Sequence, residues 1–421
     1  MLEQPHFGRR LRKLRLQRGL SQAAVVGEGM STGYLSRLES GERRPTPRAV
    51  TYLAQRLGIE ESVLSEPQDG DSLSRELAAA ASAPPGTECA AALLRALRED
   101  DSADPAARWQ ALWQLSRIDH HNGDYEAERA RLRQLIELND LLAAPELTVR
   151  SNVCYARCLR TLGDLRAAEP AASTALAVAL EKALPTADTL PALVALIGIE
   201  TDLGRLDAAR VHVDELERNL LPSATAPQAA EALCTASLVS HRQGDHVTAQ
   251  RRLETALELL HSRDDLTLWT RLRTAATATA LELSPPRVEA ARRWLREASV
   301  VIDLIGTPPQ VQELRVLRAH LAFHEGRLDE ARTLSRALLC SDDLRLPYRE
   351  RVRLAALDGR LAILDGRVEE GIGILERLGR QATGARNLDL ATHVWQSLAT
   401  TLAAVRGPAA HDTGTTPAHD T

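Results

Sequence analysis

Small polar residues and a single arginine alternate with leucines in the segment STGYLSRLES, residues 31–40. In a helix, Leu35 and Leu38 would lie on one side of this segment and the short polar residues on the other. A helix can enter the major groove of DNA only if its outward residues are short enough to let the backbone approach, with one or two long donors that reach the base edges. The pattern therefore predicts base contacts from Thr32, Gly33, Ser36 and Arg37.

Two further arginines, Arg43 and Arg44, follow in the loop after this predicted helix. A guanidinium in that place can bind phosphate oxygens without reading the base sequence. The charge distribution agrees, because the first 64 residues hold 11 arginines and lysines against 6 aspartates and glutamates, although the whole chain has a net charge of -5. A basic terminal module ahead of a long acidic body indicates nucleic-acid binding by that module.

The helices that must position these residues can be read from capping residues and apolar spacing. A first helix is expected to end at Gly19, a short second helix to begin after Ser21, and a third to begin after Ser31. Thr46 and Pro47 predict the N-cap and the first position of a fourth helix. Apolar spacing predicts that this fourth helix packs inward through Val50, Leu53, Ala54 and Leu57.

This segment resembles the Cro/repressor-like helix-turn-helix family, also called the XRE family, in the stretches LRKLRLQRGLSQ and YLSRLESGERRPTPRAVTYLAQRLG. The resemblance spans roughly residues 6–64 and implies a lambda-repressor-like helical bundle. It gives the base-facing positions to the same four residues of the third helix and a structural role to Glu39. Together with the loop arginines Arg43 and Arg44, it gives phosphate contacts to Gln22, Ser31 and Ser40. The turn GEGMS is one residue shorter than the usual family pattern.

The rest of the chain has an internal period of about 40 residues. Segments such as LGDLRAAE, QGDHVTAQ and EGRLDEAR recur with a glycine at the same place, and LSPPRVEAARR has Pro285 where one further glycine would stand. Small residues recur seven positions before and five positions after the glycine, as expected where two helices cross closely. The glycines of the period are Gly123, Gly163, Gly204, Gly244, Gly326 and Gly366. The period predicts seven antiparallel helix pairs.

These units resemble the tetratricopeptide repeat (TPR) family over about residues 105–384, with a leading helix at 89–99 and a capping helix at 387–405. The resemblance implies an α-solenoid of about seven TPR-like helix pairs, and the predicted fold class is all-α. The predicted domains are a helix-turn-helix domain at 1–65, a linker with one short helix at 66–88, a repeat domain at 89–405 and a disordered tail at 406–421.

In TPR solenoids the first helix of each pair lines a concave wall, and we expect the residue six positions before each glycine to face it. Three arginines and a histidine fall among these positions, which favours a groove for carboxylates such as a peptide terminus or acidic side chains. The predicted effector groove consists of Gln110, Trp113, Arg117, His120, Arg157, Arg160, His241, His320 and Arg360.

Other chemistry has little support in the sequence. Neither of the two lysines has the setting of a phosphate-binding loop, and no Ser-His-Asp arrangement emerges. Cys154 and Cys158 are four residues apart, as are His320 and His324, but neither pair has the further ligands of a metal site. We expect no cofactor, no metal and no enzymatic activity. Five scattered cysteines, the lack of a secretory signal and the shortness of the apolar runs predict a cytoplasmic protein that does not enter a membrane.

The order of the two predicted domains is similar to the peptide-responsive bacterial regulators grouped as RRNPP. This similarity implies a transcription regulator whose partners are double-stranded DNA, a signalling peptide or protein effector in the repeat domain, and a second copy in a homodimer. The alternative is an adaptor whose repeats hold a protein partner and whose DNA-binding module is vestigial or serves localisation. A base preference that depends on Arg37 would distinguish the regulator from the adaptor.

Overall fold

The computed structural model describes residues 4, 6–27, 29–65, 72–82, 87–99, 104–283 and 285–406. These residues form helices and connecting turns, with no β-strand among them, so the all-α prediction is confirmed. The chain divides into two compact units, Met1–Ala111 and Leu112–Thr421. Within the described residues, no helix combines the length and the apolar character that crossing a membrane requires. The predicted tail lies outside the described residues from residue 407 onward.

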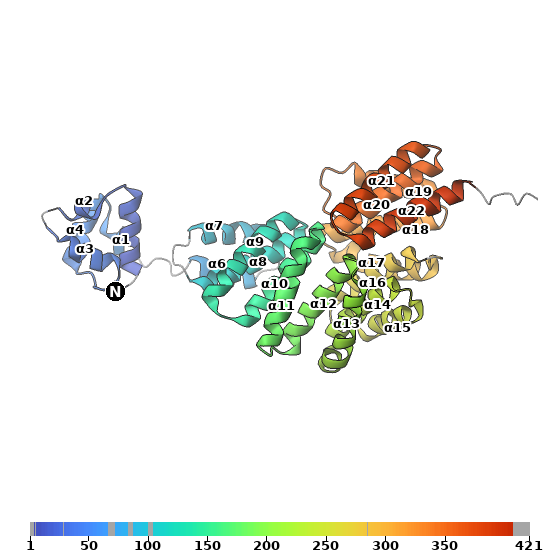
Figure 1. Ribbon diagram of the computed structural model, residues 1–421. Coiled ribbons are helices and arrows are strands. Elements are labelled where there is room, and N and C mark those ends of the chain that lie inside the picture. Colours follow the sequence, from blue (N-terminus) through green and yellow to red (C-terminus); the bar gives the residue numbers. More distant parts are fainter. Residues whose placement is uncertain are drawn as a thin grey trace, which may run out of the picture. The chain divides into compact units, whose positions relative to one another are not determined.

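The first unit begins with a bundle of five helices (Figure 1), namely α1 (His6–Gln17), α2 (Gln22–Val26), α3 (Thr32–Glu39), α4 (Pro47–Leu57) and α5 (Glu61–Ser65). Each predicted N-cap is in place: Ser21, Ser31 and Thr46 accept hydrogen bonds from backbone N–H groups three residues later. The buried core joins all five helices and includes Leu11, Val25, Leu35, Leu38, Val50, Leu53, Leu57 and Leu64. Local capping and apolar spacing therefore specify this bundle as predicted.

Two helices follow in the first unit, α6 (Ser72–Ser82) and α7 (Thr87–Glu99). The short helix expected in the linker is therefore present as α6. It packs against α7, and each of the two helices buries leucines: Leu73 and Leu77 on α6, and Leu93 on α7. A helix in the predicted linker thus has a partner of its own, which the sequence pattern did not indicate.

The remaining helices form antiparallel pairs followed by a single capping helix (Figure 1). The pairs are α8 (Pro105–Asn122) with α9 (Tyr125–Leu142), α10 (Pro145–Leu162) with α11 (Leu165–Glu181), α12 (Thr186–Asp202) with α13 (Leu206–Glu215), α14 (Ala226–Arg242) with α15 (His246–Leu259), α16 (Leu266–Glu282) with α17 (Val288–Ile305), α18 (Pro308–His324) with α19 (Leu328–Leu339), and α20 (Tyr348–Leu364) with α21 (Val368–Gly384). The capping helix is α22 (Leu388–Arg406). The seven predicted pairs and the predicted cap are confirmed.

The recurring glycines make the turns within these pairs. All six have positive φ, between 74° at Gly204 and 85° at Gly163 and Gly366, a conformation that costs a residue with a Cβ more than it costs glycine. At Gly163 the backbone N–H donates to the carbonyl groups of Leu159 and Arg160, which closes the end of α10. The spacing of these glycines along the chain is therefore also the spacing of the helix pairs.

Small residues let the paired helices cross closely, as the sequence predicted. A Cβ added to Gly371 on α21 would lie 2.4 Å from the backbone oxygen of Gly359 on α20. Alanines fill the equivalent contacts of earlier pairs, where Ala156 and Ala168 are fully buried in one core cluster. The packing distance between helices, rather than chemistry, therefore explains these residue types.

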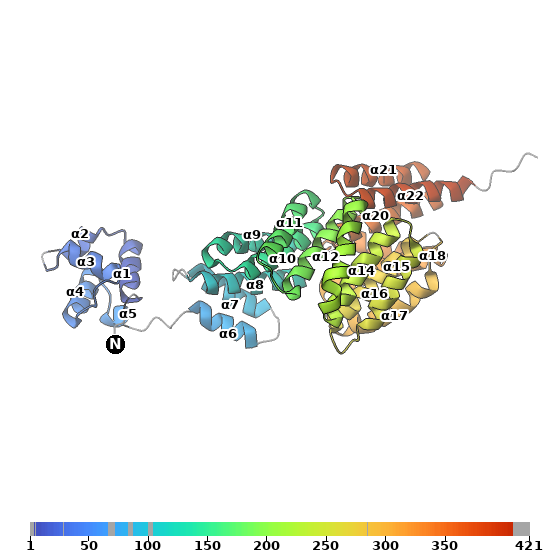
Figure 2. The same ribbon diagram turned by 60° about the horizontal axis from the view of Figure 1, so that its bottom comes forward.

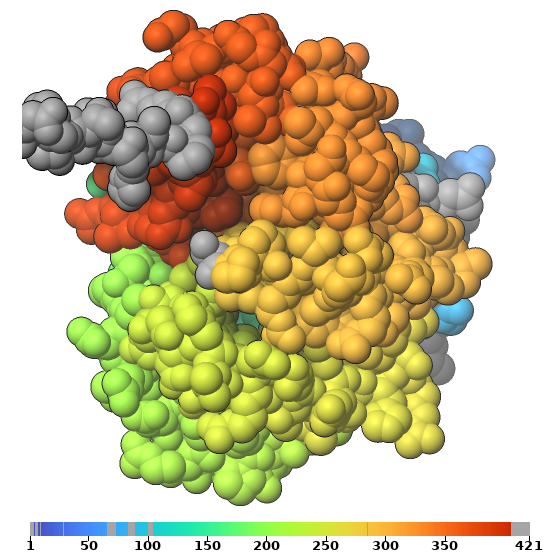
Figure 3. Space-filling view, turned by 90° about the vertical axis from the view of Figure 1, so that its right-hand side faces the viewer, coloured from blue at the N-terminus to red at the C-terminus, as the bar shows by residue number. Residues whose placement is uncertain are grey.

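The repeat coil returns on itself. Along the chain α12, α14, α16, α18, α20 and α22 contact one another in succession, and α22 also contacts α12 while α20 contacts α10. Arg345 Nη1 donates a hydrogen bond of 2.6 Å to the backbone oxygen of Asn122. Figure 2 shows α20, α21 and α22 lying over α12 and α14, and Figure 3 shows a narrow opening between segments coloured yellow-green and orange. The first helices of the pairs therefore line the inside of a closed coil.

Candidate functional site

The four predicted base-contact residues share the exposed face of α3. Thr32, Gly33, Ser36 and Arg37 are all exposed, whereas Leu35 and Leu38 are completely buried beneath them. A Cβ added to Gly33 would meet no atom within 4 Å, so other atoms of the protein do not cover the backbone on this side. The helix therefore presents short residues and one long donor on its outward side, as a major-groove helix must.

The predicted phosphate contacts surround this helix. Arg43 and Arg44 are exposed, and the Arg43 guanidinium lies 4.8 Å from the ring centroid of Tyr34. The Ser31 hydroxyl accepts a hydrogen bond from the backbone N–H of Tyr34, and the Ser40 hydroxyl donates to the backbone oxygen of Arg37. Both hydroxyl groups therefore cap α3 at its ends while remaining exposed.

A buried ion pair fixes α3 against α1. Arg15 donates to both carboxylate oxygens of Glu39, at 2.6 and 2.9 Å, and both side chains are over 90% buried. The hydrogen bond to Glu39 raises the pKa of Arg15 despite burial. Gln22, the predicted first residue of α2, donates to Glu39 at 2.8 Å. The structural role expected of Glu39 is confirmed, and the amide of Gln22 belongs to the same network.

The short turn between α2 and α3 is held by two residues of α4. The Arg56 guanidinium donates to the backbone oxygens of Val25 and Ala24, and the Tyr52 hydroxyl donates to Val26 at 2.6 Å. These contacts satisfy the carbonyl groups at the end of α2, which have no partner inside the helix. A Cβ added to Gly29 would lie 2.5 Å from the Tyr52 ring. The shortened turn is therefore a packed element that sets where α3 begins.

Two arginines of the predicted effector groove, Arg157 and Arg160, pair with acidic residues of other repeats. Arg157 Nη2 lies 3.2 Å from Glu231 Oε1, and Arg160 Nε lies 2.6 Å from Asp202 Oδ2. These carboxylates come from α14 and α12, so the groove arginines are neutralised across repeats.

The pairs belong to a larger set that we call the interior charge network. It lies on the first helices of successive pairs and on α22, and its members are Arg157, Arg160, Asp202, Glu231, Arg242, Glu282, Arg349, Glu350, Arg353 and Asp389. Signs alternate through the network, so each buried charge has an opposite neighbour, as burial of ionised groups requires.

Arg349, on the first helix of the last repeat, connects that repeat to the earlier repeats in the interior charge network. Its Nη2 atom lies 2.9 Å from Asp202 Oδ1 and also contacts Asp389. Burial opposes ionisation of Asp202, but the arginines Arg160 and Arg349 hold its pKa below the ordinary value. The same opposition applies to Glu282, where Arg353 and Arg242 outweigh burial and keep its pKa well below the ordinary value.

Most members of this network were missed in the sequence, although a signal was present. Asp202, Arg242 and Glu282 stand 40 positions apart in three successive repeats, with alternating sign. A comparison of equivalent positions in successive repeats, rather than of local motifs, would have shown that these charged residues occupy the same position in each repeat.

Other predicted groove residues have separate surroundings. His120 and Arg117 are exposed on α8, Trp113 is partly buried, and His120 Nδ1 lies 3.0 Å from Glu128 Oε2 on α9. Gln110 is exposed and belongs to the first unit. Within the second unit, the predicted groove residues therefore have different neighbours.

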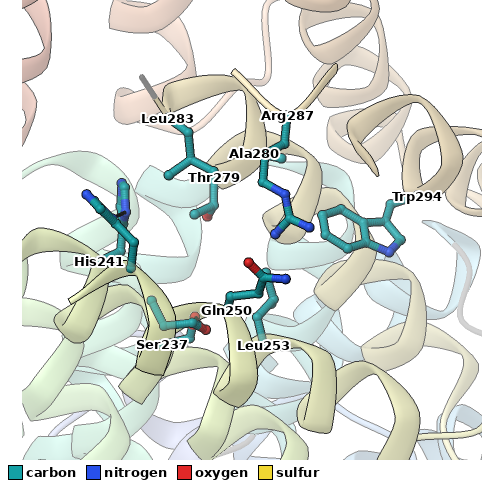
Figure 4. Close-up of a pocket in the computed structure, with 11 residues that line it drawn as sticks. Ser237, His241, Gln250, Leu253, Thr279, Ala280, Leu283, Arg287 and Trp294 are labelled. Atoms are coloured by element: carbon teal, nitrogen blue, oxygen red, sulfur yellow. Dashed lines mark hydrogen bonds between the residues drawn. The ribbon is translucent and has the colours of Figure 1, made fainter. Parts of the chain in front are cut away.

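His241 borders a pocket of ≈ 110 Å³ between α14, α15, α16 and α17. Figure 4 shows Arg287 and Gln250 pointing toward each other, with His241 and Trp294 on opposite sides. The Nδ1 atoms of His241 and His246 are 3.3 Å apart. Burial and the nearby Arg242 lower the pKa of His241, so the imidazole is neutral at pH 7.

His320 and Arg360 occupy equivalent positions on α18 and α20, six residues before Gly326 and Gly366. His320 is 5% exposed. Arg360 Nε donates to the Thr401 hydroxyl at 3.1 Å, and its guanidinium lies 4.2 Å from the ring centroid of Phe323. These two predicted groove residues therefore lie on helices that contact each other.

The comparisons with known proteins agree with this architecture. Residues 6–66 match a family model described as a helix-turn-helix domain. No curated protein sequence matches the chain. Among solved structures, a Rap protein complexed with Competence and Sporulation Factor is similar with a TM-score of 0.56 at 12% identity, covering 92% of this chain and 99% of that one.

Two further solved structures are similar to the chain. The Rap conjugation gene regulator of plasmid pLS20, in complex with the Phr* peptide, has a TM-score of 0.54 at 11% identity and covers 92% of this chain and 98% of that one. Bacillus thuringiensis PlcR, in complex with the peptide PapR7 and DNA, has a TM-score of 0.30 at 14% identity over 75% and 98%. The chain therefore carries an N-terminal helix-turn-helix domain and shares the helical-repeat fold of the Rap proteins.

Proposed function

We propose that this protein is a DNA-binding transcription regulator of the cytoplasm whose repeat domain binds an effector, a short peptide or a protein, and mediates dimerisation. The helix-turn-helix domain at 1–65 reads DNA, the segment 66–88 connects it, and the repeats at 89–405 receive the effector. The observation that carries the proposal is the outward face of α3, where three short residues and Arg37 are exposed on a helix anchored from beneath by a buried ion pair.

The proposed DNA contacts follow from this face. Thr32, Gly33, Ser36 and Arg37 meet base edges, because they lie together on the exposed side of α3. The phosphate contacts come from the residues that flank α3, namely Gln22, Ser31, Ser40, Arg43 and Arg44. A basic module of this kind gains most of its affinity from phosphates and its specificity from the helix.

The proposed effector role rests on the fold of the repeats. Both Rap structures contain a bound factor, Competence and Sporulation Factor in one and the Phr* peptide in the other. In this chain the inside of the coil carries buried charged groups on successive helices, which suits recognition of a polar peptide. An effector that prefers one curvature of the coil shifts the coil toward it and thereby resets the spacing of two DNA-reading heads in a dimer.

Genomic footprinting of the purified full chain, with and without cell extract, tests this function. We expect enrichment of palindromic or directly repeated sites, because two heads joined by a dimer read two half-sites. We also expect the extract to change the occupancy of these sites. A protein that retains a protein partner from the extract but protects no DNA site would instead be an adaptor.

A further inference from the structure

Arg360 is an exception among the inner arginines. Arg157, Arg160, Arg242, Arg349 and Arg353 each form an ion pair with at least one carboxylate. Among the residues that the structure describes, Arg360 has no such partner, and its contacts are the Thr401 hydroxyl and the Phe323 ring. Burial lowers the pKa of Arg360 to about 10, so the guanidinium remains charged at pH 7. A partly buried cation without an anion costs folding free energy.

The neighbouring His320 has an unsatisfied nitrogen. Its side chain is buried, and its Nε2 atom has no hydrogen-bond partner among the described residues. Burial, followed by the charges of Arg353, His393, His324 and Arg360, lowers its pKa well below the ordinary value. The imidazole is therefore neutral, and its unpaired polar atom adds a further cost in folding free energy.

The two residues lie on helices that pack together, and the charge of Arg360 is among the causes that lower the pKa of His320. Arg360 stacks on Phe323, whose ring is in edge contact with His324 at 5.5 Å. Arg360 is also close enough to lower the pKa of His324, which burial brings to about 4. α18 and α20 pack together here through Ala319, Ala322, Leu357 and Leu361. A cation without an anion and an imidazole nitrogen without a hydrogen-bond partner therefore lie on neighbouring helices.

We propose that the Arg360 guanidinium and the His320 imidazole form a subsite for a carboxylate group, with Thr401 holding Arg360 in place. The carboxylate belongs either to a peptide, as its terminus or an acidic side chain, or to a small free acid. The inference rests on the proposed effector role of the repeats and names the chemical group that the effector presents. A planar guanidinium binds a carboxylate through two parallel hydrogen bonds.

The test uses the full chain without DNA and follows thermal unfolding. The small-molecule arm adds sodium acetate or sodium succinate, with sodium chloride at equal ionic strength as the control. The peptide arm adds a random tetrapeptide mixture with free carboxyl termini, and the same mixture with amidated termini. We expect a carboxylate to raise the unfolding temperature and amidation to weaken the effect of the peptides at least tenfold. Stabilisation by acetate or succinate alone identifies a free acid, and stabilisation by free-carboxyl peptides alone identifies a peptide.

Arg360→Met is the decisive variant. Because it removes a partly buried cation without an anion, we expect it to fold and to unfold at a higher temperature than the unmodified protein when no carboxylate is added. Its stabilisation by carboxylates should fall at least tenfold. Arg336→Met removes an exposed arginine of α19 and should leave the response to carboxylates unchanged.

Three results would overturn the subsite. One is a lowered unfolding temperature of Arg360→Met together with an unchanged response to carboxylates, which would make Arg360 structural. Another is stabilisation by inorganic phosphate but by no carboxylate. The third is the absence of any response in either arm. Footprinting on DNA is scored separately, so failure of this subsite and failure of the proposed DNA binding give different results.

Discussion

Individual arginines of the helix-turn-helix domain differ in what their positions allow. Arg37 is on the exposed face of α3. The leucines Leu35 and Leu38 on the same helix are buried, so the Arg37 side chain lies on the side facing away from the core. Arg44 lies in the loop that follows and is exposed. A guanidinium on the inserted helix meets base edges, whereas one in the flanking loop meets phosphate oxygens.

Substitution of these two arginines should therefore separate specificity from affinity. We expect Arg37→Ala to cost about 1–3 kcal/mol on the preferred site and to flatten base preference, and Arg44→Ala to weaken all duplexes alike and to reduce the salt slope by about 1. Anisotropy titrations on specific and random duplexes at several salt concentrations measure both effects. Equal losses on the two duplexes from both variants would argue against base reading by α3.

Glu313 on α18 is a carboxyl group whose surroundings oppose its ionisation. Burial, and then the charge of Glu350, raise the pKa of Glu313 to about 7, although Arg353 and a hydrogen bond with Thr274 act in the other direction. The folded state therefore binds this proton more tightly than the unfolded state does. As pH rises from about 4.5 to 7, the folded state loses stability relative to the unfolded state.

Glu313→Gln should remove this loss of folded-state stability with rising pH. We expect a higher unfolding temperature than the unmodified protein at pH 8 and a smaller difference at pH 4, with a flatter dependence between the two. The reason is that glutamine retains the shape of the protonated acid and has no proton to release. Thermal unfolding across this pH range measures the effect. Glu369→Gln, at an exposed position of α21, serves as the control, and an identical pH profile for both variants would contradict the argument.

At the scale of the helix pair, the crossing of α20 and α21 depends on two glycines that contact each other. A Cβ on Gly371 would lie 2.4 Å from the Gly359 oxygen and 2.5 Å from the Ile363 side chain. Gly373, two residues farther along α21, is exposed, and a Cβ there would meet nothing within 4 Å. The two sites differ in packing but share the same helix.

Gly371→Ala should destabilise the repeat domain by about 1–3 kcal/mol, because the helices must separate to admit the methyl group. Gly373→Ala should stabilise it by up to about 1 kcal/mol, because alanine favours a helix interior more than glycine does. Denaturant unfolding of both variants gives the comparison. Destabilisation of similar size at both positions would show that helix propensity, rather than the crossing, determines the effect.

The helices themselves were largely predictable from local sequence. Ser21, Ser31 and Thr46 cap the helices they were expected to cap, and the glycine period located the turns of the repeats. These features depend on residues within a few positions of each other. The exposed set on α3 was predictable for the same reason, because it follows from the buried Leu35 and Leu38.

Contacts between distant elements were not predictable in this way. The pairing of Arg160 with Asp202 depends on the rotation between repeats, and that of Arg349 with Asp202 depends on the coil returning on itself. The support of the short turn by Tyr52 and Arg56 likewise depends on how α4 packs. A single sequence shows the residue types at these positions but not the angles that bring them together.

At the scale of the whole repeat unit, the coil is closed by a small number of polar contacts. Arg349 joins Asp202 of α12 to Asp389 of α22. Burial opposes ionisation of Arg349, but these two acids raise its pKa well above the ordinary value. Each acid also has a second arginine, Arg160 and Arg242 respectively. Loss of Arg349 therefore weakens the closure without leaving a carboxylate wholly unpaired.

Arg349→Met should open the coil. We expect a lower unfolding temperature, a larger radius of gyration in solution scattering, and faster hydrogen exchange in α12 and α22. The physical reason is that two buried carboxylates each lose one partner, and breaking a buried pair costs more than breaking an exposed one. Arg327→Met, which removes an arginine that pairs with Glu325 and Glu330 at the surface, should change none of the three measurements appreciably. An unchanged radius of gyration in Arg349→Met would show that apolar contacts alone close the coil.

Closure of the coil also changes how this domain folds. In an open repeat array each unit touches only its neighbours, so structure can begin anywhere and spread, and a terminal unit can be lost at the cost of one interface. Here Arg349 meets a residue 147 positions away, and Arg345 meets one 223 positions away. Joining such remote parts of the chain raises the loop-closure entropy that precedes the native contacts and slows folding. We therefore expect the domain to complete its folding late in its synthesis, after α22 has left the ribosome and the first and last repeats can meet.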